Sequence, residues 1–204
     1  MQISKPRARS CTIGVLALQG DYAAHRDALR DSGSEVVLVR TPQELRDVSG
    51  LVIPGGESTA VLKLLSFINM FEEIKRFSVV KPVFGTCAGC IILAKKVLPA
   101  PQESLALLDI DVQRNAYGRQ TDSRVAVGEY VGSEIPLEMV LIRAPLIVRT
   151  GPDVEILARY LGAPTLVRQS NILAATFHPE LSADRRIHCF FHTMVCESIR
   201  RTLA

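Results

Sequence analysis

Two cysteines in one short segment have the type and spacing for chemistry, and they support two incompatible interpretations. Cys87 and Cys90 lie in residues 83–90, VFGTCAGC. A Cys-x-x-Cys spacing is typical of a thiol redox pair or of half a zinc site. A Gly-x-Cys-x-Gly pattern between a strand and a helix is typical of a nucleophile elbow, in which one residue is held in strained backbone geometry.

The residues around Cys87 suit the elbow. Gly85, Ala88 and Gly89 are small, as a sharp strand-to-helix turn requires. A helix that begins at Ala88 directs the positive end of its dipole and its free N–H groups at the sulfur, which favours the thiolate and offers donors to an oxyanion. The competing interpretation is that Cys87 is a small buried apolar residue, the commonest fate of a free cysteine.

A base and a group to orient it occur together near the end of the chain. Residues 174–180 read AATFHPE, an apolar run that ends in His178, Pro179 and Glu180. Proline biases the preceding histidine towards extended backbone, in which residues two apart project to the same side. We therefore expect Glu180 to orient the imidazole of His178 while its other nitrogen meets Cys87.

The redox and zinc interpretations find less support. Cys90 falls within an apolar series that continues to Leu93, which predicts a buried position. A zinc site needs a second ligand pair. The candidates are His188, Cys189, His192 and Cys196. Their segment must also form an inward apolar stripe, so we expect no metal.

Alternating elements in the first half of the chain predict the architecture that positions these residues. Short apolar runs predict strands at 12–18, 35–39, 50–54 and 82–85. Helical patterns predict helices at 21–33, 42–46, 58–76 and 88–97. This alternation predicts an α/β three-layer sandwich with a mostly parallel central sheet and helices on both faces. Cys87 then lies at the carboxyl end of a strand, where open α/β sheets collect their chemistry.

The second half changes character. Residues 112–143 contain β-like runs punctuated by Gly and Pro, which predict antiparallel additions to the sheet. Residues 166–177 predict a hairpin that turns at 169–171, and residues 183–203 predict an amphipathic closing helix. We expect one domain at 12–204, preceded by a flexible basic lead-in at 1–11.

Composition excludes several classes of function. The chain has 204 residues, 48% hydrophobic and 22% charged, with a net charge of +3. This charge is too small to predict binding to nucleic acid or to an anionic membrane, and no apolar run is long enough for a spanning helix. The odd number of cysteines, five, predicts free thiols in a reducing, cytoplasmic compartment.

The motifs together resemble a known family. GTCAG with a distant HPE resembles the triad of class I glutamine amidotransferases, which have a flavodoxin-like fold. The closer resemblance is to the family of glutaminase subunits of pyridoxal-phosphate synthase. Six segments carry it in order: GVLALQG (14–20), LVIPGGEST (51–59), FGTCAG (84–89), RNAYGRQ (114–120), IRAP (142–145) and FHPEL (177–181).

The resemblance implies a role for each matching residue. Cys87 is implied as the nucleophile, His178 as general base and acid, and Glu180 as its orienting group. The oxyanion hole is implied at Gly55, Gly56 and Ala88. The residues implied in glutamine binding are Gly56, Glu57, Ser58, Arg114, Ile142 and Arg143. Arginine suits the α-carboxylate of glutamine and Glu57 suits its ammonium group.

The resemblance also implies the reaction and the partner. L-Glutamine is expected to lose its side-chain amide through a cysteine thioester, with no cofactor. The ammonia is expected to pass to a separate synthase subunit, assembled as a large ring with glutaminases bound around it, that makes pyridoxal phosphate.

Three features depart from the family pattern. Cys90 replaces a bulky aliphatic residue, Ser170 replaces a glycine in the hairpin, and the basic lead-in precedes the strand used near the partner. Three other functions remain as alternatives: a thiol oxidoreductase that uses Cys87 and Cys90, a catalytically silent partner-binding relative, and another elbow-cysteine family with chaperone or protease-like roles.

Overall fold

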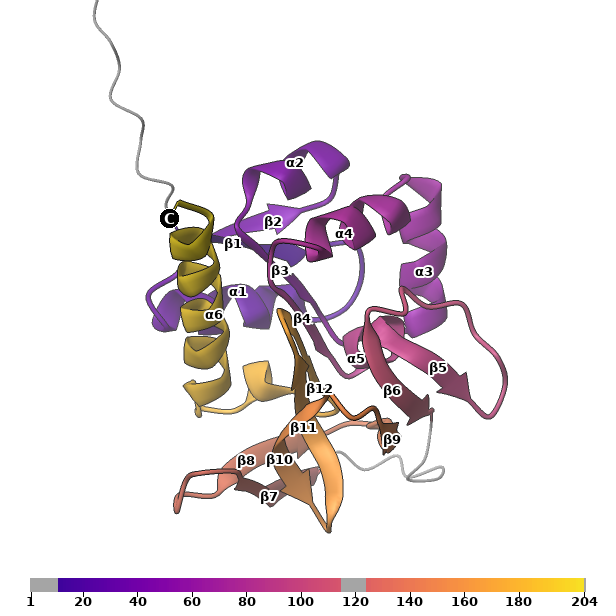
Figure 1. The fold of residues 1–204 in the computed structure, drawn as a ribbon, viewed down its shortest axis with the longest axis vertical. Coiled ribbons are helices and arrows are strands. Elements are labelled where there is room, and N and C mark those ends of the chain that lie inside the picture. The colour runs from indigo at the N-terminus through magenta and orange to yellow at the C-terminus, as the bar shows by residue number, and fades with distance from the viewer. Residues whose placement is uncertain (1–10, 115–123, 204) are drawn as a thin grey trace, which may run out of the picture.

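A nine-stranded sheet organises the molecule (Figure 1). The structure is a computed structural model that describes residues 11–114 and 124–203. The strand order is β2-β1-β3-β4-β12-β11-β10-β7-β8. The first five of these strands are parallel: β2 (Glu35–Val39), β1 (Thr12–Leu16), β3 (Gly50–Ile53), β4 (Val83–Thr86) and β12 (Ile172–Ala175). β3, β4 and β12 are buried along their whole length, as strands covered on both faces must be.

The remaining four strands are antiparallel and extend the sheet beyond the helices. They are β11 (Ala163–Gln169), β10 (Glu155–Tyr160), β7 (Arg124–Tyr130) and β8 (Leu137–Leu141). In β7 Ala126 is buried while its neighbours Val125 and Val127 are exposed, so this part of the sheet has one covered face. The antiparallel additions predicted at 112–143 are therefore confirmed for β7 and β8, whereas β10 was not predicted.

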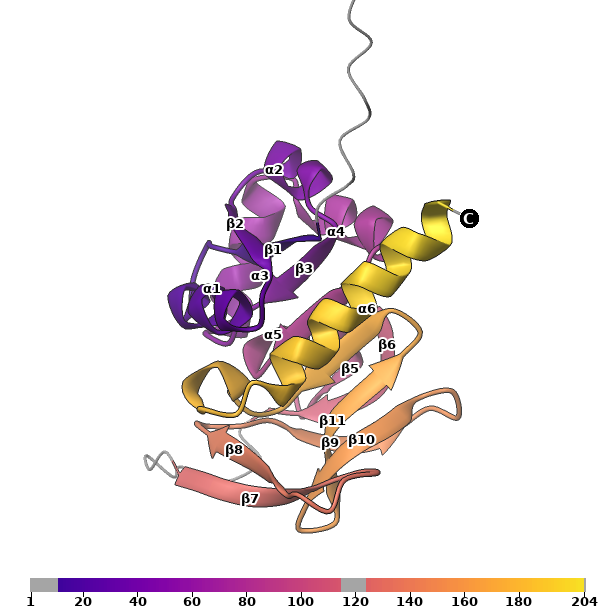
Figure 2. The ribbon, with the colours of Figure 1, turned by 90° about the vertical axis from the view of Figure 1, so that its left-hand side faces the viewer.

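Helices cover both faces of the parallel half (Figures 1 and 2). On one face α1 (Tyr22–Asp31) and α6 (Arg186–Leu203) bury a core that includes Leu29 and Phe191. On the other face lies a second core, to which four helices contribute: α2 (Pro42–Asp47), α3 (Ser58–Phe67), α4 (Phe71–Ser78) and α5 (Ala88–Leu93). This confirms the predicted α/β three-layer class.

The predicted long helix at 58–76 is wrong. The structure divides it into α3 and α4 at Asn69, whose φ is +55°. Asparagine tolerates this left-handed conformation, which commonly follows the last helical residue. The turn lets the Met70 N–H donate to the Leu65 carbonyl at 2.8 Å and buries the Met70 side chain. The apolar periodicity continues across Asn69, so the sequence pattern did not indicate the break between α3 and α4.

The predicted helix at 88–97 is also wrong in its second half. α5 ends at Leu93, and Ala94–Leu98 forms strand β5, with Lys95 and Lys96 exposed. β5 pairs in parallel with β6 (Leu108–Gln113), which pairs antiparallel with β9 (Leu146–Thr150). This small separate sheet was not predicted, because Leu93, Ala94 and Val97 continue the helical spacing of α5.

The first strand ends at Leu16, earlier than expected, and the hairpin of β11 and β12 is confirmed, with Ser170 at φ +53°. The closing helix begins at Arg186. Most of the lead-in and residues 115–120 of the RNAYGRQ segment lie outside the described residues. Within the described part of the chain, no helix has the length and apolar character needed to cross a bilayer.

Candidate active site

The turn between β4 and α5 holds Cys87 in a conformation that L-residues rarely adopt. Its φ is +49° and its ψ is −102°. The Cys87 N–H donates to the Ala175 carbonyl at 2.8 Å, which ties the turn to β12. A Cβ built on Gly89 would lie 2.2 Å from the Ile53 carbonyl oxygen, so only glycine lets α5 approach β3 this closely. The backbone is that of the predicted nucleophile elbow.

His178 and Glu180 meet as expected, but through a different backbone. Residues Pro179–Leu181 form a single 3₁₀ turn, η1, rather than continuing an extended strand. Proline is favoured at the first position of such a turn. The turn places the His178 Nδ1 and the Glu180 Oε1 at 2.7 Å, and both residues are buried, with exposed fractions of 7% and 5%.

Gly55 shows how close the histidine and the cysteine lie. A Cβ built on Gly55 would lie 2.4 Å from the Cε1 atom of His178 and 3.2 Å from the Cβ atom of Cys87. The two side chains therefore flank the same glycine. The Nδ1 atom of His178 is bonded to Glu180, so Nε2 is the nitrogen left to face the sulfur.

Electrostatics favours a charged form of this cluster. Burial lowers the pKa of His178, but the neighbouring Cys87 sulfur and the Glu180 carboxylate outweigh it and raise the pKa to about 10. Burial opposes ionisation of Glu180, yet His25 and His178 hold its pKa below the ordinary value. The arrangement can hold an imidazolium between a sulfur and a carboxylate.

Cys90 lies inside the core and not in the site. Its side chain is 0% exposed, and burial raises the pKa of its thiol strongly, with the nearby Cys87 adding to the effect. A neutral, inaccessible thiol is a poor redox partner. Both cysteines are free in the structure.

Cys90→Ser is expected to leave the hydrolytic activity of the chain within about twofold of wild type, because Cys90 packs behind the elbow and faces no solvent. The free energy of unfolding is expected to fall by about 1–3 kcal/mol, because a hydroxyl replaces an apolar contact in the core. Glutamine turnover and thermal unfolding measure the two effects. A loss of turnover in a variant that remains folded would favour the thiol oxidoreductase alternative.

The two glycines after β3 shape the opposite wall. Gly56 has φ +155°, and a Cβ there would lie 2.4 Å from the Gln19 Oε1 atom. The same Oε1 accepts a hydrogen bond from the Glu57 N–H at 2.8 Å. Gln19, from the segment after β1, therefore braces this turn. It belongs to the GVLALQG motif, but its role was not predicted.

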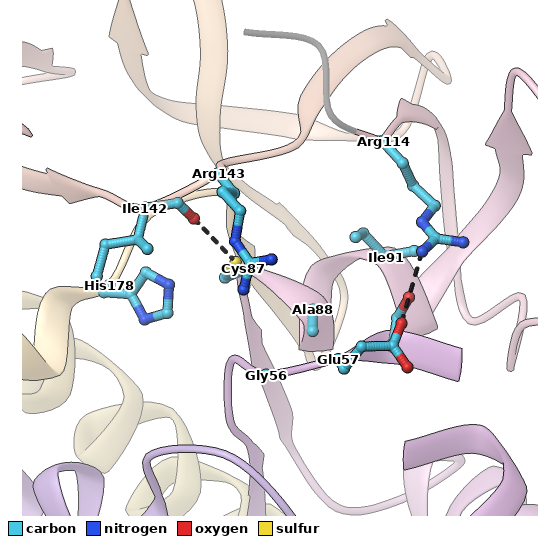
Figure 3. A pocket seen from close by; sticks show the side chains of 10 residues that line it. Gly56, Glu57, Cys87, Ala88, Ile91, Arg114, Ile142, Arg143 and His178 are labelled. Carbon is cyan, nitrogen blue, oxygen red and sulfur yellow. Dashed lines mark hydrogen bonds and ion pairs between the residues drawn. The ribbon is translucent and has the colours of Figure 1, made fainter. Parts of the chain in front are cut away.

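The cavity beside Cys87 has a volume of about 150 Å³ (Figure 3). It brings together most of the predicted residues, and it also includes Ile91, which was not predicted. His178 and Ile142 lie on one side of the cavity, and Glu57 and Arg114 lie on the other. The lining residues are Gly56, Glu57, Ser58, Cys87, Ala88, Ile91, Arg114, Ile142, Arg143 and His178. Gly55 lies behind the imidazole and is not among them.

The two arginines of the cavity differ in their partners. Arg114 lies 3.6 Å from the Glu57 carboxylate and donates to the Gln102 side chain, which also accepts from Ser58 at 3.3 Å. Gln102 was missed because no motif surrounds it. Glu57 is itself engaged as the cap of α3, accepting from the backbone of Thr59 and Ala60.

Arg143 is the cation available to a bound anion. Within the described ranges, no hydrogen bond or ion pair links its guanidinium to a carboxylate, and it lines the cavity together with Cys87. Its φ of +45° turns the chain after β8, next to Ile142, whose carbonyl lies 3.8 Å from the Cys87 sulfur. Strained backbone of this kind is often found at functional sites.

A strained cysteine on a strand-to-helix turn, a buried His–Glu pair and a cationic pocket, built on an open α/β sheet, form the arrangement expected of a cysteine hydrolase. A profile of the SNO glutamine amidotransferase family matches residues 15–197. The chain belongs to this family.

Individual relatives agree with the family match. The "Pyridoxal 5'-phosphate synthase subunit PdxT" of Koribacter versatilis is 55% identical and covers 90% of this chain and 95% of its own length. The protein of the same name from Thermosipho africanus is 49% identical, with coverage of 90% and 98%. A crystal structure described as glutamine amidotransferase superposes with a TM-score of 0.85 at 42% identity and covers 90% of this chain and 98% of that one.

A more distant structure supports the fold alone. It is described as PurLQS from Thermotoga maritima, and it has a TM-score of 0.59 at 17% identity, with coverage of 95% of this chain and 98% of that one.

Proposed function

We propose that this chain is the glutaminase subunit of a pyridoxal 5'-phosphate synthase. The names and coverage of its curated relatives support this, as does membership of a glutamine amidotransferase family. The observation that carries the proposal is the buried contact of His178 with Glu180 beside the strained Cys87, at the edge of a cavity lined by the Arg143 guanidinium. No cofactor is needed for this chemistry.

The reaction proceeds by two acyl transfers. The Cys87 sulfur attacks the side-chain amide carbon of glutamine and forms a C–S bond. His178 gives its proton to the leaving nitrogen as the C–N bond breaks, and ammonia departs. A water molecule then attacks the thioester while His178 accepts its proton, and glutamate leaves as the thiolate returns. Glu180 holds the imidazole in the orientation that both steps require.

The negative charge that develops on the amide oxygen needs hydrogen-bond donors. We assign this task to the backbone N–H groups of Ala88 and Gly56, which line the cavity. Gly55 completes the turn and contributes by making room for His178, since any side chain there would collide with the ring. Gln19 holds the turn in place from behind.

The polar ends of glutamine need their own partners. Arg143 is the residue we assign to the α-carboxylate, because its guanidinium is unpaired among the described residues and lines the cavity. Arg114 and Glu57 form the far wall, where Glu57 faces the α-ammonium and Arg114 adds charge balance. Ser58 and Ile142 complete the walls of the cavity.

Ammonia released into water at neutral pH is protonated and lost as a nucleophile. A separate synthase subunit that binds over the cavity removes this loss, which is the physical reason for a tight protein partner. We propose a hetero-oligomer in which several of these chains surround a ring of synthase subunits. We further place the chain in the cytoplasm, where its cysteines, free in the structure, stay reduced.

The test of the proposed function is glutamine hydrolysis by the purified chain with and without a synthase subunit. We expect equal amounts of glutamate and ammonia when the synthase subunit is bound. Asparagine is expected to release negligible ammonia, because its shorter side chain cannot reach Cys87 while its carboxylate binds Arg143. A chain that binds the synthase tightly and releases no glutamate would instead be the silent partner-binding relative.

Arg143→Met is expected to raise KM for glutamine by about ten- to a hundredfold, because one charge-assisted contact to the carboxylate is worth about 1.5–3 kcal/mol. Turnover at saturation is expected to change much less, because the substitution leaves Cys87 and His178 untouched. Arg143→Lys is the matched control, with charge retained and the bidentate geometry lost, and an intermediate KM is expected. An unchanged KM in Arg143→Met would remove this residue from glutamine binding.

A further inference from the structure

A buried histidine outside the three proposed catalytic residues contacts Glu180. His25, on α1, is 0% exposed, and its Nε2 atom lies 3.2 Å from the Glu180 Oε2 atom. The same Nε2 lies 2.9 Å from the Thr86 hydroxyl, next to the nucleophile. The Oε2 atom is buried and has no aligned hydrogen bond among the described residues. His25 thus places a nitrogen 3.2 Å from a buried oxygen that needs a donor.

A second histidine continues the chain of contacts. The Nδ1 atom of His25 lies 3.2 Å from the Nε2 atom of His188 on α6, which is also 0% exposed. Burial lowers the pKa of His188 to about 3, and burial likewise lowers the pKa of His25 despite the nearby Glu180. Both rings are therefore neutral at neutral pH.

Because the imidazoles of His25 and His188 are neutral, each carries a single N–H, and their contacts allow only one placement of these two protons. A carboxylate accepts hydrogen bonds and donates none, so the proton of His25 lies on Nε2, facing Glu180 and Thr86. The Nδ1 atom of His25 must then accept, and His188 donates to it through its Nε2–H. His188 in this way selects the tautomer of His25.

We propose that His25 is a positioning residue of the glutaminase site, holding the Oε2 atom of Glu180 with its Nε2–H while His188 selects its tautomer. This role rests on the proposed function. Oε1 is hydrogen-bonded to His178 and Oε2 lies 3.2 Å from the Nε2 atom of His25, so contacts at both oxygens oppose rotation of the carboxylate and keep the imidazole that it orients aligned with Cys87.

The test compares two substitutions of equal length. His25→Gln keeps an N–H near the position of Nε2, whereas His25→Met fills similar space without a donor. We expect His25→Met to lower kcat by about ten- to a hundredfold with a small change in KM, and His25→Gln to recover most of the loss. Thermal unfolding of both variants separates this effect from a general loss of packing.

The pH dependence of kcat/KM distinguishes the proposed role of His25 from a loss of packing, because a loss of packing alone does not shift it. Loss of a donor raises the pKa of buried Glu180, so its carboxylate is protonated, and His178 released, at a higher pH than in wild type. The acidic limb of kcat/KM is expected to move upward by about one pH unit in His25→Met. The groups that face His25 are Glu180, His178, Asp21 and His188, and Arg185 faces His188.

Alkylation of Cys87 by iodoacetamide at a series of pH values repeats the test without glutamine. If wild type hydrolyses no glutamine, the proposed function fails, while the alkylation profile still reports on His25. An acidic limb that stays in place in His25→Met, or equal losses in the Gln and Met variants, would overturn the role of His25. If His25→Met does not fold, His188→Met replaces it and is expected to shift the limb in the same direction.

An independent cluster of soft ligands joins the beginning of the described chain to its last helix. Cys11, His192 and Cys196 each offer one ligand atom, and these atoms all lie within 4.8 Å of one another. The Cys196 sulfur and the His192 Nε2 atom are 3.3 Å apart. The Nδ1 atom of His192 lies 2.7 Å from the Ser34 hydroxyl, which leaves Nε2 facing the sulfurs.

We infer that these three residues bind one zinc-class cation, with water as the fourth ligand. Two thiolates and one imidazole at these separations suit tetrahedral zinc, and a second hydrogen bond that orients the imidazole is typical of such sites. The sequence pattern offered His192 and Cys196 as zinc ligands, but only as partners of Cys87 and Cys90. Cys11 was missed because it lies 181 residues from His192.

Cobalt and zinc titrations of the reduced chain test this inference. We expect one metal per chain, a thiolate-to-cobalt charge-transfer band, and at least a tenfold loss of affinity in Cys11→Ser and in Cys196→Ser. Cys189→Ser removes an exposed cysteine of the same helix and is expected to bind as wild type does. Equal loss in Cys189→Ser, or no loss in Cys196→Ser, would mean adventitious binding only and would overturn the site.

Discussion

Cys87→Ala is expected to lower kcat for glutamine hydrolysis by at least about a thousandfold, the largest effect among the substitutions considered. The sulfur is the atom that forms the bond to the substrate, and the remaining groups can stabilise charge but cannot replace it. The strained φ of Cys87 is imposed by the turn and by the fit of Gly89 against β3, so alanine is expected to keep the elbow intact. Glutamate release in the presence of the synthase subunit measures the loss.

Binding distinguishes this result from unfolding. Glutamine is expected to bind Cys87→Ala with an affinity close to that for wild type, because the sulfur contributes little to recognition of the α-carboxylate by Arg143. Calorimetry of glutamine binding and a thermal melt are the controls. Turnover of Cys87→Ala equal to that of wild type would end the hydrolase assignment.

Gly55→Ala is expected to lower kcat by about a hundred- to a thousandfold without contact between the new methyl group and the substrate. The methyl carbon would lie 2.4 Å from the Cε1 atom of His178, so the ring must leave its present position beside Cys87. Displacement of a catalytic group by about 1 Å costs about a hundredfold or more in rate. Gly55 does not have a positive φ, so the backbone itself tolerates alanine and the collision is the cause.

Gly132→Ala is the matched control for this substitution. Gly132 has φ +78°, and nothing lies within 4 Å of a Cβ placed there, so alanine adds backbone strain and no collision. We expect normal kcat and a loss of about 1 kcal/mol in the free energy of unfolding. Kinetics of both variants, with thermal melts, make the comparison. Equal kcat values for Gly55→Ala and wild type would show that His178 does not need its position beside Gly55.

The parallel half of the fold could be predicted from sequence because its signals are local. Apolar runs marked β1 to β4, and the short helix predicted at 42–46 is present as α2, capped by Thr41 and Glu44. The elements that were missed lack such a local signal. Asn69 interrupts an apolar series without any change of composition, and Lys95 and Lys96 form a strand because β6 offers it an edge.

The candidate site also contains residues that could be predicted from the sequence and residues that could not. Cys87 and the His178–Glu180 pair carry recognisable neighbours, so their approach could be predicted before any coordinates. Gln102 and His25 have no motif around them. Gln102 contacts Ser58 and Arg114, which line the cavity, because Arg114 follows directly after β6. His25 reaches Glu180 because α1 packs beside η1. A lone polar residue gains its partner from tertiary structure, and no spacing rule reveals it.

The central claim is that sulfur at residue 87 becomes covalently acylated by glutamine. Rapid quenching of wild type with glutamine and the synthase subunit, followed by mass spectrometry of the peptides, tests it directly. A glutamyl group is predicted on the peptide that contains Cys87, appearing before steady state and absent from Cys87→Ala. Steady glutamate release with no adduct on that peptide, or with one on another cysteine, would contradict the account.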